Sequence, residues 1–502
     1  STPIKSSAAS DVYKRQIQGW MILILGWVFV PFYTRSMVYT MPEFLERRYN
    51  PQSRTILSVI SLVSYVLTKV AVTVYAGGLV FQQVFGIKEL WGIDFFWIAA
   101  IGLVVLTALY TIFGGMKSVL YTSVLQTPIL LLGSLIILVL GFKELGGWDE
   151  MMRVCGAVTV NNYGDTMTNL IRSNDDANFP WLGALIGSAI IGFWYWCTDQ
   201  FIVQRVLSGK NEMEARRGTI FGAYLKLLPV FLFLIPGMIA FALHQKYIGA
   251  GGEGFLPMLA NGTANADAAF PTLVAKLLPA GVKGLVVCGI LAALMSSLAS
   301  LFNSSAMLFT IDFYKRFRPE TPEKKLVGIG QVATVVIVIL GILWIPIMRS
   351  VGDVLYTYLQ DVQSVLAPGI AAAFLLGICW KRTSAQGGMW GLIAGMVIGL
   401  TRLGAKVYYS NAGEVADSTF KYLFYDMNWL FFCGWMFLFC IIVVIVVSLA
   451  TKAPTAEKIQ GLVFGTATKE QKAATRASWN HWDIIHTVII LAITGAFYWY
   501  FW

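Results

Sequence analysis

A row of hydroxyl and amide side chains crosses an apolar stretch of this chain, at residues 285–311. The row consists of Ser296, Ser297, Ser300, Asn303, Ser304 and Ser305. Such groups are costly in hydrocarbon unless they find partners. Small residues spaced four apart, from Ala292 to Ser304, favour close helix packing. The competing interpretation is a polar ligand held at the middle of a membrane.

Composition decides which class of protein carries this row. Hydrophobic residues make up 57% of the 502 residues, aromatic residues 14% and charged residues only 13%. A helix needs roughly 20 apolar residues to span a bilayer. The sequence therefore predicts an all-α polytopic membrane protein with spans near 17–34, 56–86, 93–113, 118–142, 181–200, 218–244, 285–311, 326–348, 354–379, 387–404, 429–450 and 482–502.

The net charge of +10 follows from the loops. Every second loop is rich in Lys and Arg, as at 35–54, 205–217, 315–325 and 452–476. The positive-inside rule places these loops in the cytoplasm and predicts a multi-pass protein of the cytoplasmic (inner) membrane. The basic residues are scattered over short loops and form no patch, so we expect no nucleic-acid partner.

The spans predict two inverted repeats of five helices, a plan in which the first helix of each repeat is unwound around a ligand. Five spans fit a second repeat at 181–379, but only four precede it, at 17–142. The segment SSAASDVYKRQ at 6–16 resembles a translated sequencing adapter, so we expect residues 1–16 to be a non-native or disordered leader. We expect native sequence to begin near Ile17 and the first repeat helix to be missing. Residues 143–180 are predicted as an extracellular loop and 380–502 as three additional spans.

Six ordered segments resemble the sodium/solute symporter (SSS) family, specifically its sodium-glucose cotransporter branch. They are MPEFLERRYN at 41–50, GGMKSVLYTSVLQT at 114–127, FWYWCTDQFIVQR at 193–205, GAYLKLLPVFLFLIPGM at 222–238, AALMSSLASLFNSSAMLFTIDFYKRF at 292–317 and LQDVQSVLAPGI at 359–370. The resemblance extends over nearly all of residues 17–502. It implies a LeuT-like fold of inverted five-helix repeats with extra flanking helices. In family members, one or two helices precede the position of Ile17.

The resemblance implies a sodium site on the hydroxyl-bearing span. Ala293, Ser296 and Ser297 match the family's ligands, and sodium is a hard cation that takes oxygen ligands. The remaining ligands are main-chain carbonyls of the missing helix. Ser123 stands where the family usually has Asp, close to the cytoplasmic exit of the ion. Either sodium affinity is altered or a proton substitutes, and the sequence does not decide between these.

The resemblance also implies a sugar site. Lys226 and Gln360 match positions that bind sugar hydroxyls, and Tyr195 and Trp196 match the aromatic inner gate. Tyr356, one helical turn before Gln360, is a weaker candidate for the pocket wall. These residue types suit a sugar, because donors and acceptors hold its hydroxyls while aromatic rings stack on its apolar face.

Each of these residues also has a structural interpretation. Lys226 could instead form an ion pair with Asp199 or Asp361. The aromatic pair could instead belong to a belt at the membrane interface. Lys69 and the Trp-Tyr-Trp run at 194–196 favour the glucose and inositol branch over the proline and pantothenate branches, whereas Gly192 occupies a place where some sugar transporters have Asn.

The expected function is sodium-coupled symport of a sugar resembling glucose or galactose, by alternating access. Alternatives are a symporter of the same fold for inositol or another polyol, and a fragment unable to transport. An intramembrane enzyme is disfavoured because the Ser pair has no convergent base, and a channel because no filter segment repeats. Expected partners are the sugar, the sodium ion and the lipid bilayer, and no obligate protein partner is inferred.

Overall fold

The computed structural model describes the backbone of residues 19–38, 40–159, 164–169, 171–176, 179–258, 262, 264–351, 355–411 and 416–500. The fold is almost entirely helical, with one antiparallel hairpin of β1 (Glu89–Leu90) and β2 (Ile93–Asp94). In the first half of the chain the helical segments are η1 (Leu25–Phe29), α2 (Val30–Ser36), α3 (Met41–Arg48), α4 (Pro51–Ser64), η2 (Tyr65–Val70), α5 (Ala71–Phe85), α6 (Phe95–Leu145), α7 (Trp148–Gly156), α8 (Trp181–Phe193), η3 (Trp194–Thr198), α9 (Gln200–Leu207), α10 (Glu212–Pro229), η4 (Val230–Leu234), α11 (Ile235–Gly249), η5 (Ala266–Ala268) and α12 (Ala269–Leu277).

The second half continues in the same way. Its helical segments are α13 (Ala280–Met307), η6 (Leu308–Tyr314), α14 (Lys315–Phe317), α15 (Glu323–Val351), α16 (Leu355–Cys379), α17 (Ala385–Asn411), α18 (Thr419–Lys421), η7 (Tyr422–Asp426), α19 (Trp429–Ala450), η8 (Ala456–Lys458), α20 (Lys469–Ala477) and α21 (His481–Tyr500). The η segments are π-helical except the 3-10 helices η5 and η8.

Nine helices of the described residues are long and apolar enough to cross a membrane, or ten with the bent pair Gly19–Ser36 and Met41–Arg48. The multi-pass helical prediction is confirmed, but twelve separate spans are not seen. The spans expected at 93–113 and 118–142 form one continuous helix, α6, of 51 residues. The stretch around Lys117 does not interrupt it, since lysine is a good helix former and glycine weakens a helix without breaking it. The stretch at 218–244 lies in α10, η4 and α11 and does not count among the nine.

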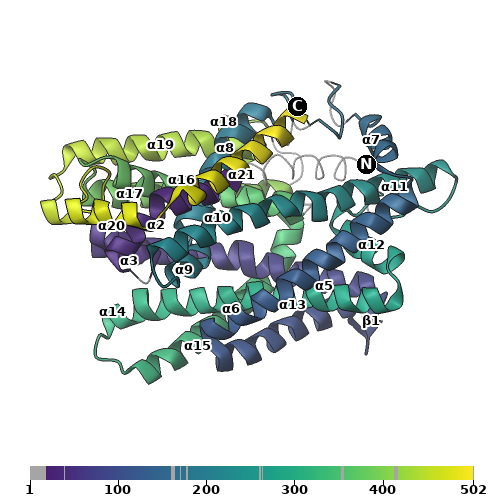
Figure 1. Cartoon of the computed structure of the whole chain (residues 1–502), viewed down its shortest axis with the longest axis horizontal. Coiled ribbons are helices and arrows are strands. Elements are labelled where there is room, and N and C mark those ends of the chain that lie inside the picture. The colour runs from purple at the N-terminus through teal and green to yellow at the C-terminus, as the bar shows by residue number, and fades with distance from the viewer. Residues whose placement is uncertain are drawn as a thin grey trace.

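Charged loop elements are separated along the molecule. Figure 1 shows most long helices running along its long axis, with α3, α14 and α20 at one end and α7, β1 and α12 at the other. The first three belong to basic stretches, so we call their end the basic end. The clustering of these elements agrees with the topology predicted from the loop charges. Of the nine spans among the described residues, α16 is the most enclosed, with 83% of its apolar stretch buried.

Local sequence explains how the helices at the basic end begin. Thr40 caps α3 by accepting a hydrogen bond from the Glu43 amide, and Asn50 caps α4 by accepting one from the Ser53 amide at 2.8 Å. Pro42 and Pro51 stand in the first turns of these helices, where a missing amide hydrogen costs nothing. These caps fix the sharp turn between α3 and α4.

Cys155 provides a chemical test of the packing outside the spans. Its thiol is buried in α7, and burial raises the pKa of Cys155 to about 12. Because only the thiolate reacts, we expect a water-soluble maleimide to leave Cys155 unmodified at about pH 8 in the folded protein and to label it after unfolding. Peptide mass spectrometry measures the labelling, with an exposed Glu253→Cys variant as the positive control. Rapid labelling of Cys155 in the folded protein would contradict this packing.

Candidate functional site

The helix that begins with α8 is interrupted near its centre. Residues Trp194–Thr198 widen into the π-helical η3, Asp199 is extended (φ −80°, ψ 126°), and α9 starts at Gln200. Sequence analysis expected a single span at 181–200 but also an unwound helix at the start of the second repeat. The break at Asp199 matches that second expectation. An interruption exposes backbone groups that a continuous helix would use internally, and such groups can bind a ligand.

A buried ion pair holds the break in place. The ammonium of Lys69, on η2, contacts the carboxylate of Asp199, and both side chains are nearly inaccessible. The Tyr65 hydroxyl donates to the same carboxylate at 2.9 Å, and the Phe201 amide donates to it at 3.2 Å. This network joins α4–η2–α5 to the interrupted helix. Breaking such a pair from one side is strongly destabilising, because the other charge stays buried.

Aromatic rings surround the same ammonium. Lys69 Nζ lies 4.6 Å from the ring centre of Tyr65, 5.2 Å from that of Tyr195 and 4.3 Å from that of Phe201. Cation–π contacts are strongest where water is excluded. The ring of Tyr195, predicted as a gate, is thus held beside the break by a cation from another helix.

Lys226 and Trp196 meet on the other face of this segment. Lys226 Nζ lies 5.0 Å from the ring centre of Trp196, whose ring in turn packs edge-on against Tyr195 at 5.2 Å. Three of the residues that the sequence assigned to sugar and gate, Lys226, Tyr195 and Trp196, therefore form one contiguous group. A cation over an indole, next to a second ring, offers both a donor and stacking surfaces to a polyhydroxylated ligand.

The two carboxylates that the sequence offered as ion-pair partners of Lys226 form ion pairs with other residues. Asp199 contacts Lys69, while Asp361 contacts Lys406 Nζ at 2.7 Å and Arg402 at 3.7 Å. Gln360, next to Asp361 on α16, is buried, and α16 packs against η3. Gln360 thus lies on the helix that neighbours the gate segment.

The predicted ion ligands all lie on α13. Ser296 is buried, and Ala293 and Ser297 are half-buried. Towards the basic end the hydroxyl row is used in packing. The Ser304 hydroxyl donates to the Ser300 carbonyl at 2.8 Å, and Arg205 donates to the Ser300 hydroxyl at 2.5 Å. The packing interpretation therefore holds for this part of the row, while ion binding by Ala293, Ser296 and Ser297 stays a prediction.

Helix α9 connects the break to α13. The Gln204 side-chain amide nitrogen donates to the Ser300 backbone carbonyl at 3.2 Å, and the Asn303 side-chain nitrogen Nδ2 donates to the Gln204 side-chain oxygen Oε1 at 3.3 Å. The helix that leaves the break is therefore bonded to the helix that carries the hydroxyl pair. Sequence analysis did not find this connection, because it depends on which faces of two distant segments meet.

A second buried carboxylate lies on the continuation of α13 into η6. Asp312 is fully buried and contacts Arg54 at 2.6 Å, and it accepts a hydrogen bond from Thr40 at 2.9 Å. Arg54 also contacts Glu46 at 2.6 Å. The capped turn between α3 and α4 is thereby tied to the same helix as the hydroxyl row.

Some sequence predictions lie outside what the structure describes. The side chains of Tyr356 and Ser123 are in this group, as are residues 1–16. The role of Asp199 as the partner of Lys69 was missed: Asp199 was considered only as a partner of Lys226, and Lys69 only as a marker of the family branch. Two opposite charges inside spans are a signal for pairing.

Comparison with known proteins decides the family. The sequence model described as the Sodium:solute symporter family matches residues 12–395. The chain belongs to this family. The sodium/mannose cotransporter of Bos taurus is 36% identical to it over 96% of this chain and 83% of the relative.

Other relatives are similar at comparable levels. Sodium/glucose cotransporter 1 of Ovis aries is 37% identical over 86% of this chain and 67% of its own. Sodium/myo-inositol cotransporter 2 of Homo sapiens is 35% identical over 89% and 67%. Membership of this family and the apolar helices identify a multi-pass membrane protein.

Solved structures support the fold of this sodium:solute symporter family member. A sodium-coupled sialic acid symporter in a substrate-bound outward-open state matches with a TM-score of 0.68 and 21% identity, over 91% of this chain and 88% of that one. A nucleobase-cation-symport-1 family transporter matches with a TM-score of 0.52 and 12% identity, over 91% and 92%. The predicted all-α, LeuT-like fold is confirmed.

Proposed function

We propose that this family member carries a sugar across the membrane together with sodium. The observation that supports the proposal most directly is the interrupted helix at Asp199, with the gate rings and Lys226 grouped beside it. The relatives named for glucose, mannose and myo-inositol cotransport support sugar-like solutes and sodium coupling. Ala293, Ser296 and Ser297 are proposed to bind the ion, while Lys226, Gln360, Tyr195 and Trp196 contact the solute.

The proposed mechanism is alternating access. Sodium entering from outside stabilises an outward-open state, the sugar then binds and the outer gate closes, and the Tyr195 ring moves aside on the inner side. A sodium ion that enters down a membrane potential of 100 mV releases about 2.3 kcal/mol of free energy, enough for roughly fifty-fold accumulation of solute. This free energy comes from the ion gradient, so the cycle needs no ATP.

Uptake into proteoliposomes tests this function, with the protein expressed from its complete gene. Labelled glucose should accumulate with an inward sodium gradient but not with potassium or choline outside. Because Ser123 replaces the family's usual Asp, a parallel arm replaces sodium by an inward proton gradient. Uphill uptake that is equal in choline, with no proton gradient, would refute ion coupling.

A polyol such as inositol is the second candidate solute. The 35% identical sodium/myo-inositol cotransporter supports it, and a cation beside two rings does not distinguish a sugar from a cyclic polyol. Competition of glucose uptake by glucose, galactose, mannose and myo-inositol separates the two. The solute with the lowest inhibition constant is the preferred substrate.

Replacing Gln360 by alanine is expected to weaken sugar binding about tenfold and to leave the sodium requirement nearly unchanged. The buried amide would no longer donate to or accept from a sugar hydroxyl, a loss of about 1–1.5 kcal/mol. The measurement is the sugar concentration at half-maximal uptake. Gln363→Ala is the matched control, since Gln363 is a buried glutamine on the same helix. Equal effects of the two variants would remove Gln360 from the sugar site.

A further inference from the structure

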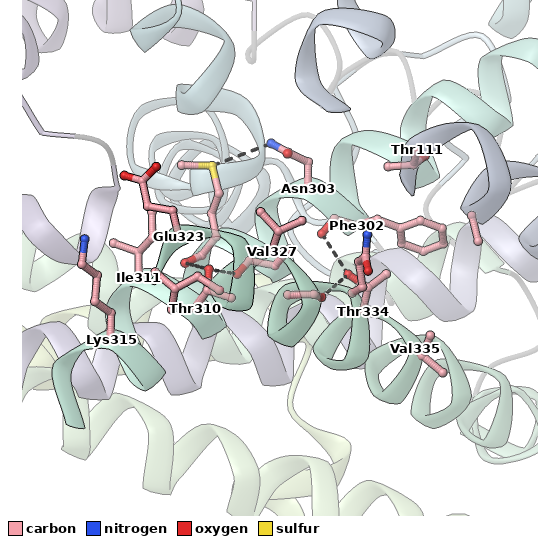
Figure 2. A pocket seen from close by; sticks show the side chains of 16 residues that line it. Thr111, Phe302, Asn303, Thr310, Ile311, Lys315, Glu323, Val327, Thr334 and Val335 are labelled. Atoms are coloured by element: carbon pink, nitrogen blue, oxygen red, sulfur yellow. Dashed lines mark hydrogen bonds between the residues drawn. The ribbon is translucent and has the colours of Figure 1, made fainter. Parts of the chain in front are cut away.

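A groove separate from the candidate site opens between α13–η6 and α15. Its volume is about 510 Å³, and its inner end is formed by Ala108 and Thr111 of α6. Figure 2 shows Lys315 and Glu323 at one end of the groove and Thr111 and Val335 at the other. None of the residues assigned to the ion or the sugar lines it.

The hydroxyls of Thr310 and Thr334 in the groove wall are bonded to their own helices. The Thr310 hydroxyl donates to the Ala306 carbonyl at 2.5 Å, and the Thr334 hydroxyl donates to the Gly330 carbonyl at 2.9 Å. Hydroxyls that bond back to their own helix are not directed at a ligand. The groove thus presents a mainly apolar surface, which suits a hydrocarbon chain better than a sugar.

One side of the groove faces outward along α15. The side chains of Val327 and Val335, which line it, are 62% and 52% exposed. Helix α15 is strongly apolar, yet only 28% of its apolar stretch is buried inside the protein. In a membrane this face is in contact with lipid, so the groove is open to lipid molecules from the side.

The end of the groove near Lys315 is basic. Residues 315–325 contain five Lys or Arg and two Glu, and Lys315 itself lines the groove. Phe317 in this segment is 66% exposed, as expected for an aromatic ring at the headgroup level. Basic residues next to a bilayer attract anionic lipids.

The dimensions match one leaflet. From Glu323 to Val335 helix α15 rises about 18 Å, at 1.5 Å per residue. Half of the hydrocarbon core is about 15 Å thick. A lipid with its phosphate at Lys315 could therefore lay one chain along the whole groove.

We propose that this groove binds one anionic phospholipid of the leaflet next to the basic end, such as phosphatidylglycerol. The phosphate contacts Lys315, a head-group hydroxyl donates to Glu323, and an acyl chain lies between α13 and α15 against Val327. The proposal does not depend on the transported solute or ion. Because α13 lines the groove, a bound lipid would contact the helix that carries Ser296 and Ser297.

Native mass spectrometry of the full-length protein titrated with phosphatidylglycerol tests the proposal. We expect one tightly bound lipid, and Lys315→Gln should weaken its binding about fivefold, the effect of one basic residue at an anionic surface. Val327→Trp should fill the groove and lower binding as well. Both positions are exposed, so neither change disturbs the core.

Two matched variants serve as controls. Lys210→Gln removes an exposed lysine of another basic loop, and Val332→Trp adds the same ring to α15 at an exposed position outside the groove. Both should bind phosphatidylglycerol like the unmodified protein. Equal binding by all four variants would overturn the proposal. So would equal affinity for phosphatidylcholine, or full displacement by inorganic phosphate, which would indicate a free-phosphate site.

Discussion

Replacing Lys69 by methionine is expected to lower the free energy of unfolding by about 3–5 kcal/mol, because Asp199 would keep a buried charge without its cation. The loss should also release the Tyr195 ring, which Lys69 contacts at 5.2 Å. The midpoint of thermal unfolding in detergent measures the first effect. Hydrogen–deuterium exchange of the segment 193–201, compared with and without Lys69→Met, measures the second.

A double variant separates the ion pair from general damage to the core. Lys69→Met combined with Asp199→Asn removes both charges, while the amide still accepts hydrogen bonds from Tyr65 and Phe201. Its loss of stability should be well below the sum of the single losses. Asp417→Asn is the surface control. Asp417 pairs with Lys421 and its side chain is 97% exposed, and such surface pairs contribute little to the free energy of unfolding. Additive losses would mean that the charges at the break act independently.

Ser297→Ala is expected to raise the sodium concentration at half-maximal uptake at least about tenfold, because a hydrogen bond or ligand contact to a charged group is worth about 1.5–3 kcal/mol. Thermal stability should change little, since Ser297 is only half-buried. Sodium-dependent uptake by the full-length protein in proteoliposomes measures the first quantity. The outcome distinguishes an ion ligand from a packing residue on α13.

The matched control for Ser297 is another serine of the same helix. Ser305 is fully buried near the basic end of α13, so Ser305→Ala changes packing on this helix away from the proposed ion ligands. We expect Ser305→Ala to leave the sodium requirement unchanged. If both variants shifted the sodium requirement equally, the hydroxyl pair would have no special role in ion binding.

Much of the architecture follows from local patterns in the chain. The length of the apolar stretches predicts the spans, and the loop charges predict the basic end. The row of hydroxyls predicts that α13 either packs closely or binds a ligand. The continuity of α6 was not predictable in this way. Two adjacent glycines followed by a lysine, as at Gly114, Gly115 and Lys117, are typical of a loop, but a helix tolerates these residues when its hydrogen bonds are intact.

The candidate site was only half predictable. Lys226 and Trp196 were assigned separately, and the structure brings them together at 5.0 Å. The partner of Asp199 could not be chosen from the sequence, since Lys69 is 130 positions away and Lys226 was an equally good candidate. The difference depends on which helix faces turn toward each other, and this is decided by packing over the whole bundle.

The bonds between α9 and α13 have a thermodynamic consequence. Gln204 on α9, which follows the interrupted helix, is hydrogen-bonded to α13, the helix that carries Ser296 and Ser297; Asn303 on α13 is bonded back to Gln204. When binding at one site changes the affinity of a second site, binding at the second site changes the affinity of the first by the same factor. For the proposed function, the factor by which sodium raises the affinity for the sugar therefore equals the factor by which the sugar raises the affinity for sodium.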